Sequence, residues 1–501
     1  MVELSRLLGG GSVCDVATAL TYQGSRWSYG DLGAVTDALT RAMCADRLSG
    51  ERVALLLPNG IELVTCYLAC FSAGVIAVPL NTRYSAPELE NALRRAGPRW
   101  LVTDVTQSSL LSAVDDSVLC GIRVITVGQI ASLTTPPEDS YEAIVDRPAL
   151  TASSMPDIAP DSPAVIFFTS GSSGRPKGVV HTHRSALAIL TSTSEALGGV
   201  QSDDVVQVFE PLVHVSGFIA TFATLLAGGT VALDAGFDIR RYAQALTANR
   251  PTLICTHIDV LVQLLRLPGV CRDWFTSLRG VYVGGDTVPA GVQREFLQCS
   301  GLPIGVGYGM TEAIWLTVQR EPSTAGQGCI GRPVGGAQLR VEETTNELLV
   351  AGPMVMQEYW KDEELTAATL KDGWFRTGDL GERDPEGVWW FTGRIKDIIV
   401  RRTSKITPGE VESALGRHPE VAMAAVIGVP DPDEGQVPVA FVVPRSEGST
   451  SVDQLKEFLA QQIAAYKIPV RIHLRSTLPL TDSGKLMRGD LREDGAEELG
   501  A

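Results

Sequence analysis

The chain has 501 residues, of which 45% are hydrophobic and 20% are charged. This composition is typical of packed globular domains and not of a disordered chain, and a chain of this length is expected to form more than one domain. The net charge of −16 disfavours a general affinity for nucleic acid or for an anionic membrane, so we predict neither as a partner.

Nine cysteines are scattered along the chain, and none has the spacing of a zinc site, so we expect buried thiols in a reducing compartment. The first six residues do not resemble a signal peptide. Residues 63–80 form the most apolar stretch, but they contain Gly74 and Pro79. We therefore predict a buried helix followed by a buried strand there, not a membrane span, and a cytoplasmic protein.

Short apolar runs alternate with amphipathic segments of helical length. The runs predict strands at residues 53–57, 75–78, 100–103, 124–127, 164–168, 252–256 and 280–283, and the amphipathic segments predict helices at residues 86–96 and 239–248. This alternation predicts an α/β architecture with mostly parallel sheets. Residues in the 130s to 150s are rich in Pro, Thr and Ser, which is typical of a linker.

The pattern changes after about residue 335, where short strands and turns are predicted. From residue 396 onward the sequence predicts a separate small α/β unit. Its expected elements are strands at residues 422–429 and 437–443 and a helix at residues 452–464.

The most informative segment joins a predicted strand to a loop of glycines and hydroxyl residues. Residues 169–178 read TSGSSGRPKG. Glycines let backbone N–H groups approach a phosphate, hydroxyls add donors, and Lys177 adds positive charge. A flexible surface loop has a similar composition, so this loop alone leaves both interpretations open. Because Gly178 follows Lys177 where a Walker A motif has Ser or Thr, a P-loop nucleotidase is disfavoured.

With six further motifs, this loop resembles the signature of the ANL superfamily of adenylating enzymes. That superfamily contains acyl-CoA synthetases, AMP-dependent ligases, adenylation domains of peptide synthetases and luciferases. The further motifs follow in the family's order: PLVHVSG at 211–217, VGGD at 283–286, GYGMTE at 307–312, GWFRTGD at 373–379, GRIKD at 393–397 and LPLTDSGK at 478–485. One motif could arise by chance, whereas the ordered series covers nearly the whole chain.

The resemblance implies a role for each matching residue. Lys485 would bridge the attacking carboxylate and the α-phosphate, Glu312 would hold Mg²⁺ beside Thr311, and His214 would border the acid pocket. Such positive groups are needed because two anions in contact repel by about 4 kcal/mol at an effective dielectric of about 20. The implied nucleotide-binding residues are Thr169, Ser170, Gly171, Ser172, Ser173, Gly174 and Lys177 at the phosphates, Gly285, Asp286, Tyr308 and Gly309 at the adenine, and Asp379 and Arg394 at the ribose. Each also has an ordinary structural interpretation, such as a solvated lysine or a core tyrosine, and it is the ordered series that favours the functional one.

The resemblance also implies the fold and the reaction. A large N-terminal domain of packed α/β subdomains, residues 1–395, would bind ATP and acid. A small mobile C-terminal α/β domain, residues 396–501, would carry the catalytic lysine, with Lys396 at the hinge. The protein would be an AMP-forming acid ligase that uses ATP and Mg²⁺ to convert a small carboxylic acid to acyl-AMP with release of pyrophosphate. The acyl group would then pass to the thiol of CoA or of a phosphopantetheine carrier protein.

One motif departs from the family pattern. After the hinge, relatives usually read Ile-x-x-x-Gly-x-x-Ile-x-Pro-x-Glu, and in residues 399–410 the glycine position is occupied by Thr403, preceded by Arg402. In thioester-forming relatives that glycine lets the pantetheine arm pass close to the backbone. A β-branched residue removes this clearance and disfavours positive φ.

The alternative hypothesis is therefore a non-thiol acceptor, through amide formation or through activation of nitrous acid for diazotisation. A third hypothesis, a catalytically silent binding protein of the same fold, is disfavoured by the presence of Lys485, Glu312 and Asp379. The pocket motif lacks the aspartate of amino-acid-activating domains, which disfavours α-amino acids as substrates. The sequence does not specify which acid is activated.

Overall fold

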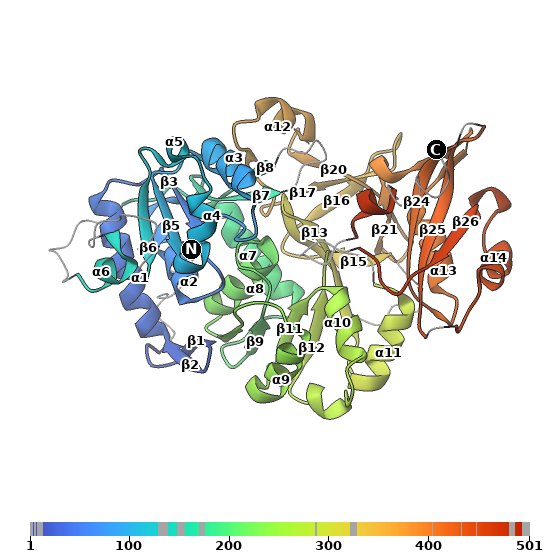
Figure 1. Cartoon of the computed structure of the whole chain (residues 1–501), viewed down its shortest axis with the longest axis horizontal. Helices are drawn as coiled ribbons and strands as arrows, with labels where there is room; N and C mark the ends of the chain where they lie inside the picture. Colours follow the sequence, from blue (N-terminus) through green and yellow to red (C-terminus); the bar gives the residue numbers. More distant parts are fainter. Residues whose placement is uncertain are drawn as a thin grey trace. The chain divides into compact units, whose positions relative to one another are not determined.

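The chain is represented by a computed structural model that describes residues 4, 7, 14–128, 139–147, 156–169, 176–285, 288–320, 328–402, 404–431, 433–446, 448–479 and 486–492. It divides into two compact units. Figure 1 labels the helices and strands and colours them by their position in the sequence. The first unit comprises residues 1–255, 310–315 and 352–371, and the second comprises residues 256–309, 316–351 and 372–501. The expected domain boundary between residues 395 and 396 lies inside the second unit and stays a prediction.

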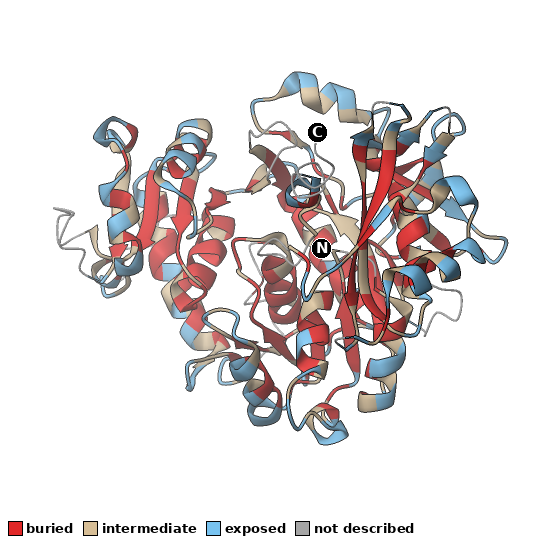
Figure 2. Cartoon of the chain, turned by 45° about the vertical axis from the view of Figure 1, so that its right-hand side comes forward, coloured by how far each residue is buried: buried red, intermediate tan, exposed pale blue. Residues whose placement is uncertain are grey.

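A seven-stranded sheet in the first unit has the order β18-β8-β7-β4-β3-β5-β6. Its strands are β3 (Arg52–Leu56), β4 (Ile76–Pro79), β5 (Trp100–Asp104), β6 (Arg123–Val127), β7 (Pro163–Thr169), β8 (Lys177–Thr182) and β18 (Glu358–Tyr359). The pairs from β7 through β4, β3 and β5 to β6 are parallel, whereas β8 and β18 pair antiparallel. Most residues of β3, β4, β5 and β7 are buried, and Figure 2 draws buried residues in red, whereas only two of the five residues of β6 are buried. The positions of β3 to β7 confirm the strands expected from the apolar runs in this part of the chain.

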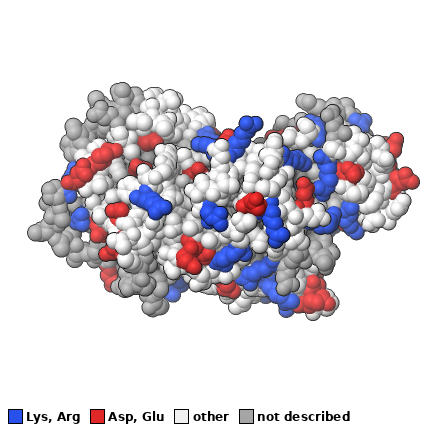
Figure 3. All heavy atoms as spheres, turned by 90° about the horizontal axis from the view of Figure 1, so that it is seen from below, with Lys and Arg blue, Asp and Glu red and all other residues white. Residues whose placement is uncertain are grey.

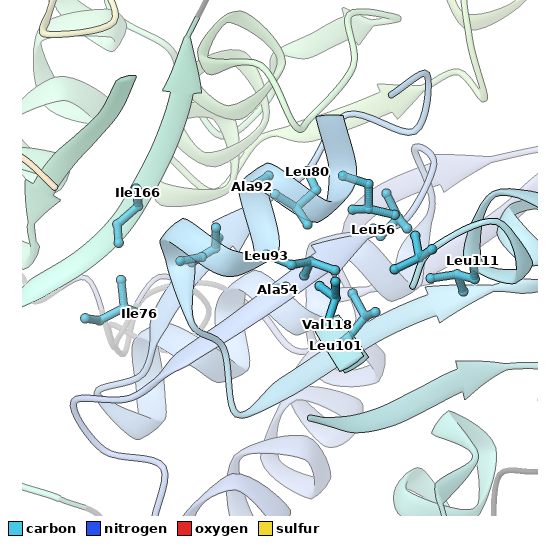
Figure 4. Close-up of a cluster of buried hydrophobic side chains, with 14 of the residues drawn as sticks. Ala54, Leu56, Ile76, Leu80, Ala92, Leu93, Leu101, Leu111, Val118 and Ile166 are labelled. Atoms are coloured by element: carbon cyan, nitrogen blue, oxygen red, sulfur yellow. The ribbon is translucent and has the colours of Figure 1, made fainter. Parts of the chain in front are cut away.

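Helices cover this sheet and bury a continuous apolar cluster. The helices α2 (Ile61–Ala73), α3 (Ala86–Ala96), α4 (Ser108–Ser112) and α5 (Asp116–Leu119) follow β3, β4 and β5. Helix α3 coincides with its prediction because Ser85 and Glu88 form a capping box at its start and Gly97, at a φ of 60°, ends it. Figure 4 shows Ala92 and Leu93 of α3 in one cluster with Ala54, Leu56 and Leu101 of the strands.

A second group of strands in the first unit has the order β11-β9-β10-β1-β2. Its elements are β1 (Thr18–Tyr22), β2 (Ser25–Ser28), β9 (Val205–Val208), β10 (Thr230–Leu233) and β11 (Leu253–Thr256), with helices α1 (Tyr29–Ala45), α7 (His183–Ala196), α8 (Val215–Leu226) and α9 (Ile239–Asn249). Tyr67 of α2 packs against Phe218 and Phe222 of α8, with ring centroids 5.5 and 5.3 Å apart. This aromatic contact joins the helices of the two sheets in one core.

The predicted linker contains a short helix. Within its described part, α6 (Tyr141–Val145) begins at Ser140, whose hydroxyl accepts a hydrogen bond from the Ala143 N–H. Tyr141 and Ile144 are buried, and the Tyr141 hydroxyl is 2.7 Å from that of Thr65. The composition is polar, but one helix cap and two apolar side chains suffice to anchor this segment, so the linker prediction is wrong for residues 141–145.

Strands of the second unit are mostly short, as expected after residue 335. They are β12 (Gly280–Val283), β13 (Ile304–Met310), β14 (Ala313–Gln319), β15 (Cys329–Pro333), β16 (Gln338–Val341), β17 (Glu347–Ala351), β20 (Trp374–Arg383) and β21 (Trp389–Arg394), accompanied by α10 (Ile258–Leu265) and α11 (Ala290–Ser300). Strands β12 and β13 pair in parallel, and β16, β17, β20, β21 and β15 form an antiparallel series. The first unit also contains α12 (Glu363–Thr369) and β19 (Leu370–Lys371).

A separate sheet in the second unit lies within residues 399–474. It consists of β22 (Ile399–Arg401), β23 (Ser404–Ile406), β24 (Val421–Asp431), β25 (Gly435–Pro444) and β26 (Arg471–Leu474), with α13 (Pro408–Gly416) and α14 (Val452–Ala460). Adjacent residues of β24 enter different clusters: Val426 packs with α13 and α14, and Ile427 packs with Leu478 and Leu491. Because both faces of this sheet are buried, the sheet has a core of its own.

Helix α14 is shorter than expected. It ends at Ala460 instead of Ala464, because the chain turns at Gln461. After the turn, Ile463 and Ile468 pack against the same cluster as Leu455 and Leu459. The buried apolar side chains therefore continue beyond the helix, which made the helix look longer in the sequence.

The exposure of the cysteines agrees only in part with the prediction that their thiols are buried. All nine cysteines are free. The prediction of buried thiols is confirmed for Cys66, Cys70, Cys255 and Cys329, holds only in part for the partly buried Cys44 and Cys299, and is wrong for the exposed Cys14, Cys120 and Cys271. They lie in turns or at helix ends, where no core covers them.

Within the described ranges, no helix has both the length and the apolarity needed to cross a membrane. On the face drawn in Figure 3, basic and acidic side chains are interspersed with large uncharged areas.

Candidate active site

The strands before and after the predicted phosphate loop lie side by side. β7 ends at Thr169 and β8 begins at Lys177, and these two residues are partners in the antiparallel register. The loop residues predicted to bind phosphate, Ser170, Gly171, Ser172, Ser173 and Gly174, lie outside the described residues. The described ends therefore fix where the loop begins and ends, with Lys177 at its exit.

A lysine, a tyrosine and a carboxylate from three distant segments meet beside the strand that leaves the loop. β18 pairs with β8, and the Lys177 Nζ atom lies 5.4 Å from the centroid of the Tyr359 ring. The Tyr359 hydroxyl donates a hydrogen bond of 2.7 Å to Oε1 of Glu312. Burial, and then the charge of Glu312, raises the pKa of Tyr359, so the phenol stays protonated and can donate. This bond orients the carboxylate that the sequence motif assigns to magnesium.

A buried histidine holds the backbone next to Glu312. His181 lies on β8, its Nε2 atom is 2.8 Å from the Thr311 carbonyl oxygen, and its Nδ1 atom is 3.3 Å from the Ser185 hydroxyl. Burial lowers the pKa of His181 to about 4, so the ring is neutral at neutral pH. A neutral ring has one N–H, and the carbonyl contact assigns it to Nε2. The strand after the phosphate loop is thus bonded to the segment of Thr311 and Glu312.

Three predicted nucleotide-binding residues meet in the second unit. The Tyr308 hydroxyl, on β13, donates a hydrogen bond of 2.8 Å to Oδ2 of Asp379. The Arg394 Nε atom is 3.3 Å from Oδ1 of Asp379, its partner in the β20–β21 register. Burial, and then the charge of Asp379, raises the pKa of Tyr308, which keeps the phenol a donor. A carboxylate offers about four acceptor positions, so Asp379 can accept hydroxyl groups in addition to these contacts.

The turn that presents Asp379 is held by a buried glutamate. Glu347 is 4% exposed, and its Oε1 atom accepts a hydrogen bond of 2.9 Å from the Gly378 N–H. Its other oxygen pairs with Arg376. Gly378 has a φ of 72°, which favours glycine, and the Asp379 N–H donates to the Thr377 hydroxyl over 3.0 Å. The position of Asp379 is therefore fixed by its own turn as well as by Tyr308.

A buried asparagine fixes the backbone of the predicted acid-pocket motif. The Asn59 Oδ1 atom accepts a hydrogen bond of 2.8 Å from the Leu212 N–H. Its Nδ2 atom donates to the carbonyl oxygens of Glu210 and Asp234, each over 3.0 Å. The Tyr67 hydroxyl donates to the Leu212 carbonyl oxygen over 2.9 Å. The seven-stranded sheet and its helix α2 thus position the motif through directional bonds.

The same motif begins helix α8. His214 occupies the N-cap position, is half-buried, and donates its backbone N–H to the Pro211 carbonyl oxygen over 2.9 Å. A Cβ atom on Gly217 would lie 2.5 Å from that same oxygen, so this position requires glycine. The close approach fixes the direction in which α8 leaves the motif. Whether His214 borders the acid stays a prediction.

The remaining predicted residues are divided between described and undescribed positions. Gly309 lies on β13, and Gly285, at a φ of 90°, lies shortly after β12. Asp286, Thr403 and the predicted catalytic Lys485 lie outside the described residues.

Four residues with clear positions in these clusters were not assigned a role from the sequence: Asn59, His181, Glu347 and Tyr359. The Pro58-Asn59-Gly60 sequence favours a turn, and it contains no signal that the Asn59 side chain binds distant backbone groups. His181 and Tyr359 gave no signal, because their partners lie at distant positions in the sequence. A buried glutamate such as Glu347 could have been suspected only from its predicted strand.

The predicted magnesium site would have one protein carboxylate, that of Glu312. Among the described residues, no group of three or more His, Cys, Asp or Glu side chains is arranged to hold a metal ion. Mg²⁺ is often held by one or two carboxylates together with substrate phosphates and water. One oriented carboxylate, that of Glu312, is therefore a suitable protein contribution.

The chain belongs to the AMP-binding enzyme family. The family profile described as AMP-binding enzyme matches residues 14–360, and the profile described as AMP-binding enzyme C-terminal domain matches residues 410–485. The protein is thus an AMP-forming acid ligase of the ANL fold, which adenylates an acid with ATP and then transfers it. The expected superfamily and α/β fold are confirmed.

Relatives extend over nearly the whole chain. An indoleacetate–CoA ligase from Aromatoleum aromaticum is 32% identical, covering 95% of this chain and 94% of the relative. A feruloyl-CoA synthase from an Amycolatopsis species is 33% identical, covering 95% of each.

Solved structures are similar over the same extent. ATP-bound MatB from Rhodopseudomonas palustris has a TM-score of 0.88 at 28% identity and covers 98% of each chain. The amide bond synthetase McbA from Marinactinospora thermotolerans has a TM-score of 0.87 at 25% identity, covering 98% of this chain and 99% of McbA.

Proposed function

We propose that this ligase activates an aromatic or arylalkyl carboxylic acid and transfers the acyl group to the thiol of CoA. The names of the two sequence relatives support this proposal, because one acts on indoleacetate, the other on ferulate, and both form CoA thioesters. The absence of the amino-acid-binding aspartate from the pocket motif also favours an acid without an α-amino group. A cytoplasmic location stays a prediction from the sequence.

The observation that carries the proposed chemistry is the meeting of Lys177, Tyr359 and Glu312. These residues come from the exit of the phosphate loop, from β18 and from the segment after β13. A lysine beside the loop would neutralise the phosphates, and Glu312 would hold Mg²⁺, which supplies further positive charge to the departing pyrophosphate. Tyr359 keeps the carboxylate oriented, and His181 keeps the adjacent backbone in place.

In the first half-reaction, an oxygen of the substrate carboxylate attacks the α-phosphorus of ATP. The bond to the β-phosphate bridging oxygen breaks, pyrophosphate leaves, and acyl-AMP forms. Tyr308 would stack on the adenine, and Asp379 and Arg394 would bind the ribose. Thr169, the loop residues 170–174 and Lys177 would hold the phosphates. Lys485 would neutralise the two approaching anions, so that binding energy is used at the transition state.

We also propose the division into residues 1–395 and a mobile domain of residues 396–501. The C-terminal family profile lies wholly within the latter range. The separate sheet of residues 399–474, buried on both faces, supports a body that can rotate as a unit. Lys396 directly precedes this body, which suits a hinge.

A second candidate is transfer of the adenylated acid to a non-thiol acceptor such as an amine, or activation of nitrous acid in place of a carboxylic acid for diazotisation of an aryl amine. Arg402, beside Thr403, has a φ of 54°, a left-handed conformation in the two-residue turn between β22 and β23. Glycine is the residue that accepts such a turn with least strain, and it is absent from both positions of this turn. The likeness to an amide bond synthetase supports the same alternative.

The acceptor can be identified by supplying candidate acceptors to the preformed adenylate. The enzyme is first incubated with ATP and an aromatic acid that gives pyrophosphate release. CoA, a carrier-protein thiol and an aryl amine are then added separately. In another reaction without the aromatic acid, nitrite and an aryl amine are supplied together with ATP. Rapid AMP release with acyl-CoA formation is the expected result. Product formation only with an amine or nitrite would replace the CoA proposal by the second candidate.

A further inference from the structure

The described residues before and after the segment that contains Lys485 are bonded to each other. The Met487 N–H donates a hydrogen bond of 2.9 Å to the carbonyl oxygen of Pro479. Leu478 is buried and Leu486 packs against the same apolar cluster, together with Leu491. The segments on either side of residues 480–485 are therefore held together by a backbone bond and by side-chain burial.

A buried ion pair anchors the chain three residues after Lys485. Arg488 Nη1 donates hydrogen bonds to Glu412 Oε1 over 2.6 Å and to the Val426 carbonyl oxygen over 2.7 Å, and Nη2 reaches Glu412 Oε2 over 3.2 Å. The Val426 N–H also donates to Glu412 Oε1, over 2.8 Å. One guanidinium thus binds α13 and β24 at the same time, in a geometry that a lysine cannot reproduce.

The same arginine reaches the residue beside the predicted hinge. Arg488 Nε lies 3.8 Å from Oδ2 of Asp397, and Arg492 Nη2 lies 3.0 Å from Oδ1 of Asp397. Asp397 is 8% exposed and directly follows Lys396. All of these groups lie between residues 397 and 492, within the predicted mobile domain. A rotation at the hinge would therefore move them as one body.

We propose that Glu412 and Asp397 are positioning residues which hold Arg488, and through it the backbone that directly follows Lys485, in the arrangement needed for adenylation. The proposal rests on the proposed function, because Lys485 is its catalytic group. A buried carboxylate is costly unless a cation and hydrogen bonds compensate it, so the network has one strongly favoured arrangement. That arrangement fixes residues 486–492 relative to Asp397, so the backbone that directly follows Lys485 in the sequence keeps a defined position relative to the predicted hinge.

The central test replaces Arg488 by lysine, which keeps the positive charge but loses the two-pronged contact with Glu412. The rate of acyl-AMP formation at saturating ATP and acid should fall at least tenfold. The KM for ATP should change less than about twofold, because the nucleotide-binding residues lie in residues 1–395. Asp397→Asn and Glu412→Gln remove the charge of the two carboxylates that bind Arg488. They should likewise lower kcat and leave the KM for ATP nearly unchanged.

Glu410→Gln is the matched control. Glu410 lies on the same helix as Glu412 but forms an exposed ion pair with Lys467, and it should leave the adenylation rate unchanged within about twofold. Rates are expressed per mole of folded enzyme, using far-ultraviolet circular dichroism. Hydrogen exchange of residues 486–492 should accelerate in Glu412→Gln and not in Glu410→Gln.

The outcomes separate this proposal from the proposed function. If the three network variants are less stable but keep the wild-type kcat, the network is only structural and the proposal is wrong. Lys485→Ala is assayed in parallel. If it loses adenylation while Arg488→Lys, Asp397→Asn and Glu412→Gln keep it, the catalytic lysine stands and only the positioning role fails. If Lys485→Ala itself keeps adenylation, both fail.

Discussion

Replacing Asp379 by alanine tests whether the cluster in the second unit binds the ribose. The Asp379 carboxylate accepts a hydrogen bond of 2.8 Å from the Tyr308 hydroxyl, and its Oδ1 atom lies 3.3 Å from Arg394 Nε. A carboxylate can accept hydrogen bonds from several donors at once, the ribose hydroxyls included. A hydrogen bond to a charged group contributes about 1.5–3 kcal/mol, which is roughly a tenfold to hundredfold change in affinity. The Kd for ATP should therefore rise at least tenfold, measured by calorimetric titration.

A comparison of two nucleotides separates ribose recognition from general damage. Wild-type enzyme should bind ATP at least tenfold more tightly than 2′,3′-dideoxy-ATP, and Asp379→Ala should bind the two about equally. These four affinities form a thermodynamic cycle that isolates the interaction between the carboxylate and the ribose hydroxyls. Tyr308→Phe is the control: it keeps the carboxylate, so the preference for ATP should persist even if both affinities fall. An undiminished preference in Asp379→Ala would refute the ribose role.

Three further predictions follow from the described contacts and from the threonine at position 403 of the sequence. Because burial lowers the pKa of His181 from 6.5 to about 4, protonation favours the unfolded chain. The stability that neutral His181 provides, about 3 kcal/mol, is complete above pH 6.5 and is lost as pH falls toward 4. In His181→Gln, the free energy of unfolding measured in urea should depend less on pH over that range than in the wild type. A pH dependence equal to that of the wild type would contradict this. Asn59→Ala should lower the free energy of unfolding by about 2–4 kcal/mol, because the hydrogen bonds from its amide to the backbone are lost. It should also raise the KM for the acid more than the KM for ATP. A decrease of less than about 1 kcal/mol would argue against this role of Asn59. Thr403→Gly should raise thioester formation while pyrophosphate exchange stays nearly constant, and a wild-type CoA turnover that matches its adenylation rate would show that Thr403 is no obstacle.

Local patterns predicted the elements whose stability is local or whose faces are uniformly buried. The strand at residues 280–283 and the helix at residues 86–96 coincide with β12 and α3, because a short apolar run and a capping box define them. The ordered motifs predicted the family, and with it Tyr308, Asp379 and Arg394, which the structure brings together. No pattern indicated that Tyr308 donates directly to Asp379.

Contacts between distant residues could not be predicted in the same way. The sequence around Tyr359 does not indicate a role in the site, because that role depends on the pairing of β18 with β8, two segments that lie far apart in the chain. The sequence around Asn59 favours a turn, but it does not indicate that the Asn59 amide forms hydrogen bonds with the backbone of Glu210, Leu212 and Asp234. Helix α14 was predicted too long because apolar side chains continue beyond its end. Each miss reflects a tertiary contact that overrides or adds to a local preference.

The most direct test of the central claim is acid-dependent exchange of labelled pyrophosphate into ATP. The panel contains aromatic and arylalkyl acids, straight-chain fatty acids and α-amino acids, each assayed with wild-type enzyme and with Lys485→Ala. We expect exchange that depends on an aromatic or arylalkyl acid, and a loss of at least tenfold in Lys485→Ala, which corresponds to about 1.4 kcal/mol of transition-state stabilisation. Absence of exchange with every acid by an enzyme that binds ATP, or equal exchange in Lys485→Ala, would contradict the account.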